Sequence, residues 1–142
     1  MTSPGGSTDS GSVCAVVVTY NRREQLRTCL QRLGDQTRPL DRIVVVDNAS
    51  DDGTPEMIAA EFPDALLVRL PENVGGAGGF HAGLERGMEL GCDWLWLLDD
   101  DTYATATALE ALLAGAARAP VPPALVASQV RWKDERLHPM NV

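Results

Sequence analysis

Short apolar runs alternate with segments of helical periodicity along this chain, and this alternation limits the folds open to it. Aliphatic and aromatic runs predict four buried strands, at residues 13–19, 43–46, 65–70 and 94–98. A fifth strand is predicted over residues 125–132. Strands separated by helices need crossover connections, which produce a parallel sheet with helices on both faces. The sequence therefore predicts an α/β fold with a mostly parallel sheet.

Polar residues that precede apolar helical patterns predict where helices begin. Asn21 predicts an N-cap, with Glu24 three residues later in the capping-box position. Thr54 followed by Pro55 predicts the N-cap and first position of a second helix. Another helix is predicted over residues 105–117, where leucines recur on one face.

A glycine-rich segment, residues 71–79, precedes the remaining predicted helix, in which Phe80, Leu84 and Met88 recur every four residues. We expect this segment to be a loop. Glycines let a backbone approach a ligand closely, and a helix start behind them presents free N–H groups to an anion. The glycines match neither the dinucleotide-binding pattern nor the Walker pattern, which disfavours a nicotinamide enzyme.

Length and charge narrow the class of protein. The 142 residues suit a single domain, and 44% of them are apolar, enough for a core. The net charge of −8 argues against a nucleic-acid-binding surface, which would be basic. Residues 1–12 are rich in Gly, Ser and Thr, so we expect a disordered tail there, followed by one domain over residues 13–142.

The cysteines and the hydropathy indicate a cellular compartment. Cys14, Cys29 and Cys92 lack metal-binding or redox spacing, so we expect small core residues in a reducing environment. No apolar stretch approaches the ~20 residues of a membrane span, and the N-terminus lacks signal-peptide features. We expect a cytoplasmic protein, and peripheral attachment at the inner face of the membrane stays open.

Polar clusters follow each of the first four predicted strands. In parallel sheets, ligands bind beyond the carboxyl ends of the strands. The clusters are Thr19-Tyr20-Asn21, Asp47, Asn73 to Gly79, and Asp99-Asp100-Asp101. The three adjacent carboxylates repel one another and favour a cation. Hard divalent ions such as Mg²⁺ and Mn²⁺ prefer such oxygen ligands and bridge to phosphates, so a metal–phosphate site is predicted.

Four of these motifs, in this order, resemble those of an inverting family-two glycosyltransferase of the GT-A fold. They are VVVTYNR at residues 16–22, IVVVDNASDDGT at 43–54, NVGGAGGF at 73–80 and DDDT at 99–102. The glycine-rich motif and the triple aspartate look most like the rhamnosyl- and galactofuranosyltransferase branch. The resemblance implies a nucleotide-diphospho-sugar transferase fold, incomplete at its C-terminal end.

The resemblance also implies roles for individual residues. The donor would be bound by residues at the strand ends, namely Thr19, Tyr20, Asn21, Asp47, Asn73, Gly75, Gly76, Asp99 and Asp100. Within that set, Asp47 would accept a hydrogen bond from the base, and Asp100 would face the donor sugar. Asp101 would bind Mn²⁺ or Mg²⁺, and Asp99 would bind the ribose or a metal-bound water.

The implied activity is metal-dependent transfer, with inversion, of a sugar from a UDP- or dTDP-sugar to an acceptor hydroxyl. The acceptor would be a saccharide or lipid-linked saccharide, in cell-surface polysaccharide or glycoconjugate synthesis. The catalytic base is unknown. In this family it is an Asp or Glu of an acceptor-binding half, which we expect to lie beyond Val142. No motif marks Asp134 or Glu135 as that base.

Two alternatives stay open on sequence alone. The same donor site would serve a non-catalytic nucleotide-sugar-binding module. A haloacid-dehalogenase-like phosphatase also places an Asp-x-Asp pair after an apolar strand, and would form an aspartyl-phosphate at Asp99. Tyr103 stands where that family has a small residue, and the motif comes late in the chain.

Overall fold

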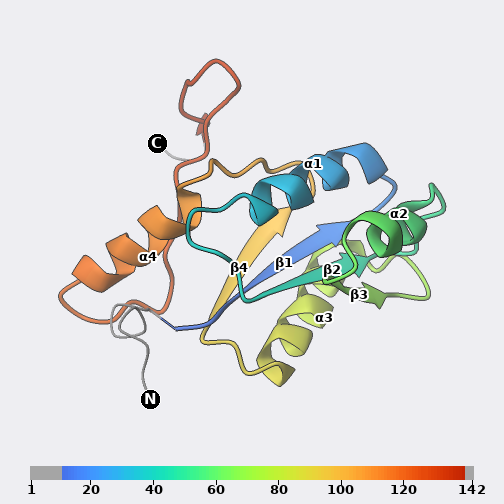
Figure 1. Ribbon diagram of the computed structural model, residues 1–142, viewed down its shortest axis with the longest axis horizontal. Coiled ribbons are helices and arrows are strands. Elements are labelled where there is room, and N and C mark those ends of the chain that lie inside the picture. The colour runs from blue at the N-terminus through green and yellow to red at the C-terminus, as the bar shows by residue number, and fades with distance from the viewer. Residues whose placement is uncertain (1–10, 140–142) are drawn as a thin grey trace.

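The computed structural model describes residues 11–139, so all but the last two residues of the predicted tail over residues 1–12 lie outside them. The elements, in chain order, are β1 (Val13–Thr19), α1 (Arg23–Gly34), β2 (Arg42–Asp47), α2 (Thr54–Glu61), β3 (Leu66–Arg69), α3 (Gly75–Glu89), β4 (Trp94–Asp99) and α4 (Ala108–Arg118). The strands form one parallel sheet in the order β3-β2-β1-β4 (Figure 1). The predicted α/β fold with a parallel sheet is confirmed.

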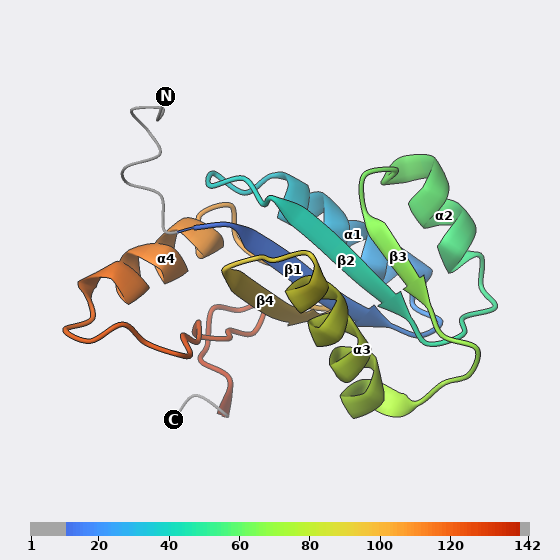
Figure 2. The ribbon, with the colours of Figure 1, turned by 90° about the horizontal axis from the view of Figure 1, so that it is seen from below.

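Alternate residues of the central strands build two cores on opposite faces of the sheet. Ala15 and Val17 of β1 pack with the apolar faces of α1 and α2. Cys14, Val16 and Val18 point to the other face, which α3 covers. Figure 2 shows α3 on the opposite side of the sheet from α1 and α2. Because both faces are covered, β1 is buried along its whole length.

A third, smaller core lies at the β4 edge of the sheet. Trp94 and Trp96 project from the same face of β4 and pack against Leu109 and Leu113 of α4. The predicted packing of these tryptophans between sheet and helix is confirmed. The cysteines are free and in the cores, and burial raises the pKa of the Cys29 thiol to about 12.

The inner face of α3 is made of glycines, which the sequence analysis did not predict. Gly79, Gly83 and Gly87 are buried, whereas Met88 is 73% exposed. A Cβ atom built on Gly83 would lie 2.3 Å from Cγ1 of Val16. The helix therefore lies so close to the sheet that these three positions have no room for a side chain, whereas Phe80 and Ala82 pack beside them. The predicted loop over residues 71–79 is also wrong in its second half, because α3 begins at Gly75.

The predicted fifth strand over residues 125–132 does not form. No neighbouring strand pairs with this segment, and among the described residues it makes a single antiparallel bridge, Arg131 to Leu137. Leu125 is 90% exposed, so the apolar residues that suggested a buried strand have no core to enter. Within residues 11–139, no helix has the length and hydropathy needed to cross a membrane.

Candidate functional site

The carboxyl ends of the strands bring the predicted site residues to one edge of the sheet. Thr19, the last residue of β1, is in register with Asp47, the last residue of β2. Val18 is in register with Asp99 at the end of β4. Because the strands are parallel, the loops that follow β1, β2 and β4 meet at this edge, as the sequence predicted.

Asp47 presents a buried acceptor without a hydrogen bond. Its side chain is fully buried, and Oδ1 accepts the backbone N–H of Ser50 at 3.3 Å. Oδ2 is the one buried side-chain N or O atom in the described part of the chain that lacks a hydrogen bond. The nearest cation, Nε of Arg69, is 3.9 Å away, beyond hydrogen-bond distance. Buried acceptors are normally paired, so this oxygen is suited to a ligand N–H.

Asp100 is held at the same edge by Thr19. The Thr19 hydroxyl donates to Oδ2 of Asp100 at 2.9 Å, in a buried contact. Only 6% of Asp100 is exposed, and burial raises the pKa of its carboxyl, against the lowering effects of Thr19 and Arg22. Asp100 therefore points into the protein, whereas the side chains of Asp99 and Asp101 lie in solvent.

The raised pKa of Asp100 predicts that ionisation of this carboxyl lowers the free energy of unfolding. A raised native pKa stabilises the fold below the unfolded value of 3.8, and this contribution is lost as pH rises through the native pKa. In Asp100→Asn the amide oxygen still accepts the Thr19 hydroxyl, but the titration is gone. We expect the unfolding free energy of the wild type, relative to Asp100→Asn, to fall as pH rises above 3.8 and then level off.

Urea denaturation in chelator-containing buffer, at a series of pH values, measures this difference. A difference that rises with pH over the same interval would show that Asp100 is stabilised in its charged form, contrary to the expectation.

Asn21 forms a turn and does not cap α1 as predicted. Its φ of 48° is outside N-cap geometry, and no side-chain cap bond is made at Arg22, the residue before the helix. The Asn21 N–H donates to Oγ of Ser50 at 2.9 Å, and its Oδ1 accepts the N–H of Asp51 at 2.8 Å. Asn21 therefore ties the loop after β1 to the loop after β2.

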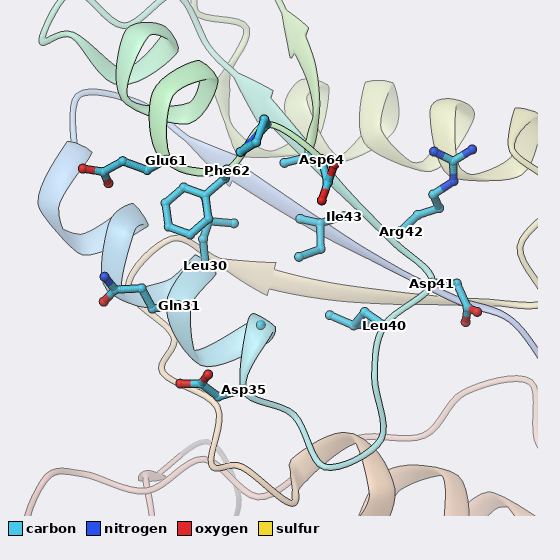
Figure 3. A pocket seen from close by; sticks show the side chains of 13 residues that line it. Leu30, Gln31, Asp35, Leu40, Asp41, Arg42, Ile43, Glu61, Phe62 and Asp64 are labelled. Carbon is cyan, nitrogen blue, oxygen red and sulfur yellow. The ribbon is translucent and has the colours of Figure 1, made fainter.

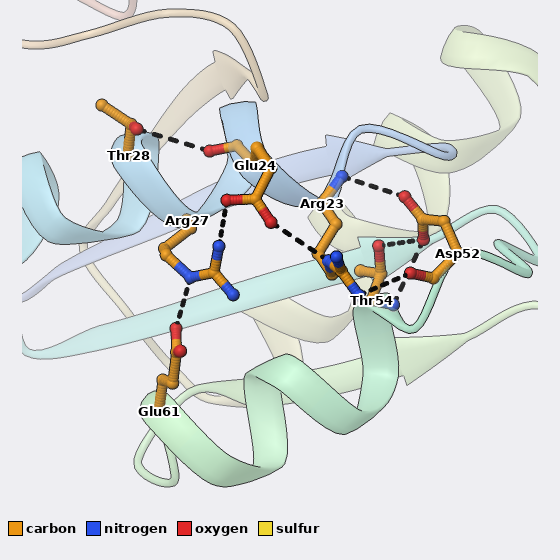
Figure 4. A network of polar contacts seen from close by, with 7 residues as sticks. All are labelled: Arg23, Glu24, Arg27, Thr28, Asp52, Thr54 and Glu61. Atoms are coloured by element: carbon orange, nitrogen blue, oxygen red, sulfur yellow. Dashed lines mark hydrogen bonds and ion pairs between the residues drawn. The ribbon is translucent and has the colours of Figure 1, made fainter.

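The first N–H of α1 is instead satisfied by a residue distant in sequence. Asp52 accepts the backbone N–H of Arg23 at 3.0 Å and also the N–H and hydroxyl of Thr54 at the start of α2. Glu24 pairs with Arg23 and Arg27 and is not free to complete a capping box. Figure 4 shows this network, which joins the starts of α1 and α2. One carboxylate thus serves two helix starts beside the candidate site.

Asn48 is a site residue to which the sequence analysis gave no role. It is 3% exposed, its Nδ2 donates to the carbonyl of Gly75 at 3.1 Å, and its Oδ1 accepts the N–H of Val74 at 3.2 Å. Asn73 accepts the N–H of Gly75 at 2.9 Å. These bonds hold the start of α3 next to Asp47. The sequence signal for Asn48 was its position, since it is an amide directly after the aspartate that ends β2.

The remaining predicted residues lie at the rim of this edge. Tyr20 is 46% exposed, and Gly76 is exposed in the first turn of α3. Asp101 accepts a hydrogen bond from Nη1 of Arg22 at 3.0 Å. Asp134 and Glu135 lie elsewhere, in the segment after α4, where they pair with arginines. The structure therefore gathers the predicted donor and metal residues around Asp47, Thr19 and Asp100.

The carboxylates at the end of β4 suit a cation that the protein and a bound ligand would coordinate together. Among residues 11–139, no three His, Cys, Asp or Glu side chains are grouped to hold a metal ion. Mg²⁺ commonly uses one or two carboxylates together with substrate phosphates and water, and does not require a full protein cage. The exposed carboxylates of Asp99 and Asp101 meet that requirement.

A hollow of about 560 Å³ lies at the opposite, amino edge of the sheet (Figure 3). Leu30, Leu40, Ile43 and Phe62 contribute apolar side chains to it, from the end of α1, the start of β2 and the residue after α2. No strand carboxyl end contributes to it. The arrangement of parallel strands therefore favours the Asp47 edge as the ligand site.

Comparison with known proteins points to one family. The model of glycosyl transferase family 2 matches residues 14–139. The chain is 43% identical over 102 residues to the galactofuranosyltransferase GlfT1 of Mycolicibacterium smegmatis, covering 71% of this chain and 34% of that protein. GlfT1 of Mycobacterium tuberculosis is 42% identical over 106 residues, covering 72% of this chain and 35% of that protein. The chain thus spans about a third of the curated relatives that it matches.

Solved structures confirm the GT-A-type fold. The mannosyltransferase PcManGT from Pyrobaculum calidifontis, in complex with GDP-Man and Mn²⁺, has a TM-score of 0.58 and 33% identity, covering 66% of this chain and 28% of that one. TarS 1-349 from S. aureus, in complex with UDP-GlcNAc, has a TM-score of 0.61 and 23% identity, covering 72% of this chain and 30% of that one.

Proposed function

The chain belongs to glycosyl transferase family 2, and from this membership we propose that it forms the donor-binding part of a metal-dependent, inverting glycosyltransferase. The enzyme moves a sugar from a nucleoside-diphosphate sugar to an acceptor hydroxyl. The observation that supports this most strongly is the buried Oδ2 of Asp47 at the carboxyl edge of the sheet, which accepts no hydrogen bond. Membership of this family leaves no reason to retain the phosphatase alternative.

The donor is a pyrimidine nucleotide in this proposal. Asp47 accepts the N–H of the base, because an ionised carboxylate offers acceptors only. Uracil and thymine carry such an N–H beside two carbonyl groups. The identity of 43% to a galactofuranosyltransferase favours galactofuranose as the transferred sugar. The solved relative that binds GDP-Man makes GDP the informative competitor to test.

Asp101 and Asp99 would hold a divalent cation between the protein and the donor diphosphate. When bound, the cation would neutralise the charge that develops on the leaving diphosphate. The Mn²⁺ in the mannosyltransferase complex supports this choice of ion. Thr19 keeps Asp100 turned inward, so Asp99 and Asp101 are the two of the three carboxylates that face solvent.

Titration of the protein with UDP, dTDP and GDP, with and without Mn²⁺, tests the proposal. We expect UDP or dTDP to bind more tightly than GDP, and Mn²⁺ to strengthen that binding. A folded sample that binds none of the three nucleotides in either condition would refute it. Nucleoside diphosphate release by the full-length enzyme, dependent on acceptor, separates transfer from mere binding.

Asp101→Asn is expected to remove most of the effect of the cation. The amide loses the negative charge that attracts the ion, so nucleotide affinity with Mn²⁺ should fall about tenfold, toward the value without Mn²⁺. Calorimetry with and without Mn²⁺ measures this. Asp134→Asn is the matched control, since Asp134 lies in the segment after α4. An unchanged response to Mn²⁺ in Asp101→Asn would argue that Asp101 is not a ligand.

A further inference from the structure

Arg22 lies between two of the three adjacent carboxylates. Its Nη1 is 3.0 Å from Oδ2 of Asp101 and 3.5 Å from Oδ1 of Asp100. Neighbouring Arg23 makes no such contact and pairs with Glu24 and Asp52. One guanidinium thus contacts a carboxylate oxygen of Asp101 and places a positive charge where a divalent cation would bind.

The ion pair between Arg22 and Asp101 is weak enough for either side chain to take another partner. The two side chains are 51% and 53% exposed, and pairs of this kind contribute roughly 0–1 kcal/mol in water. Asp100 differs, because its second oxygen is anchored by Thr19 in a buried bond. The contact with Asp101 can therefore break without disturbing the core.

The backbone around Arg22 is held in place, which limits the positions that its guanidinium can reach. Its neighbour Asn21 is held in a tight turn by Ser50 and Asp51, so only the side chain is free to move. Arg22 also stands immediately before α1, at the end of the helix that disfavours cations. An incoming diphosphate would supply negative charge there, in a form that a guanidinium can bind through two nitrogens.

We propose that Arg22 is a positioning residue that occupies Asp101 in the free protein and moves to the donor diphosphate, which frees Asp101 for the cation. This inference rests on the proposed function. It predicts that Mn²⁺ alone competes with Arg22 and binds weakly, and that nucleotide and cation strengthen each other's binding. Such coupling is reciprocal, so either ligand can be used to measure it.

Mn²⁺ titrations followed by the electron paramagnetic resonance signal of the free ion test this inference. We expect Arg22→Gln to bind Mn²⁺ alone about 2- to 5-fold more tightly than the wild type, because the competing charge is gone. The extra affinity for Mn²⁺ that UDP provides should shrink by a similar factor. Arg22→Lys keeps the charge and should bind Mn²⁺ alone nearly as weakly as the wild type.

Arg23→Gln is the matched control, since it removes the same charge one residue away and should leave Mn²⁺ binding unchanged. Thermal unfolding verifies that each variant is folded. Arg22→Gln that binds Mn²⁺ no more tightly than the wild type would overturn the inference, and so would undiminished coupling to UDP. If the wild type binds no nucleotide, the proposed function fails, whereas the titration with Mn²⁺ alone still decides whether Arg22 occupies Asp101.

Discussion

Asp47→Asn is expected to weaken UDP binding by about 10- to 100-fold, equivalent to the roughly 1.5–3 kcal/mol of a hydrogen bond to a charged group. The amide oxygen can still accept the N–H of Ser50, so the loop after β2 keeps its bond. The amide nitrogen would then replace Oδ2, which accepts no hydrogen bond in the free protein. Its N–H groups would face the N–H of the base, so the hydrogen bond to the base would be lost. Isothermal titration calorimetry with UDP and Mn²⁺ measures the loss.

Asp64→Asn is the control for Asp47→Asn, because it removes one carboxylate at the opposite edge of the sheet, beside the hollow there. UDP affinity should not change in that variant. Thermal unfolding verifies that Asp47→Asn is folded. Unchanged UDP affinity in Asp47→Asn would mean that the unpaired oxygen does not contact the nucleotide.

Gly83→Val is expected to destabilise the fold by about 3 kcal/mol, the upper end of the range for overpacked cores. A Cβ atom at this position would already lie 2.3 Å from Val16 and 3.1 Å from Val46, both in the central strands. Neither strand can retreat, because α1 and α2 cover the other face of the sheet. The melting temperature should fall by roughly 10 °C, and thermal unfolding followed by circular dichroism measures it.

Gly115→Val separates crowding from helix propensity. Gly115 lies within α4, and a Cβ there would meet nothing within 4 Å. Valine is a better helix former than glycine, so this control should be neutral or slightly stabilising. Equal losses of stability in the two variants would show that close packing of α3 against the sheet is not the cause.

The sheet, and the edge at which the candidate site residues gather, were predictable because short stretches of sequence indicate the strands and where they end. A continuous apolar run such as residues 13–19 predicts a strand that is buried on both faces. Parallel strands then place Asp47 and Asp99 at one edge whatever the details of packing. The residue that completes this region, Asn48, needed the structure, because its bonds are to the distant Val74 and Gly75.

The incorrect sequence predictions for Asn21 and α3 have a common cause, which is contact with residues distant in the sequence. Asn21 fits an N-cap locally, but Ser50 and Asp51 hold it in a turn instead. An apolar stripe predicts the buried face of a helix only when the helix leaves room for side chains. In α3 the residues closest to the sheet are glycines, which do not contribute to an apolar pattern, and Met88 of that pattern is exposed.

Left-handed residues lie in the loops around the Asp47 edge, among them Asn21, Ala49 and Gly75, with φ values of 48°, 66° and 78°. Asn21 and Gly75 accept or donate bonds from a neighbouring loop, and the bond from Ser50 to Asp47 spans Ala49. These loops therefore lose their conformational entropy when the protein folds. A ligand that binds there causes little further loss of conformational entropy in these loops. Less of the free energy of its contacts is therefore offset by ordering, and the affinity is higher.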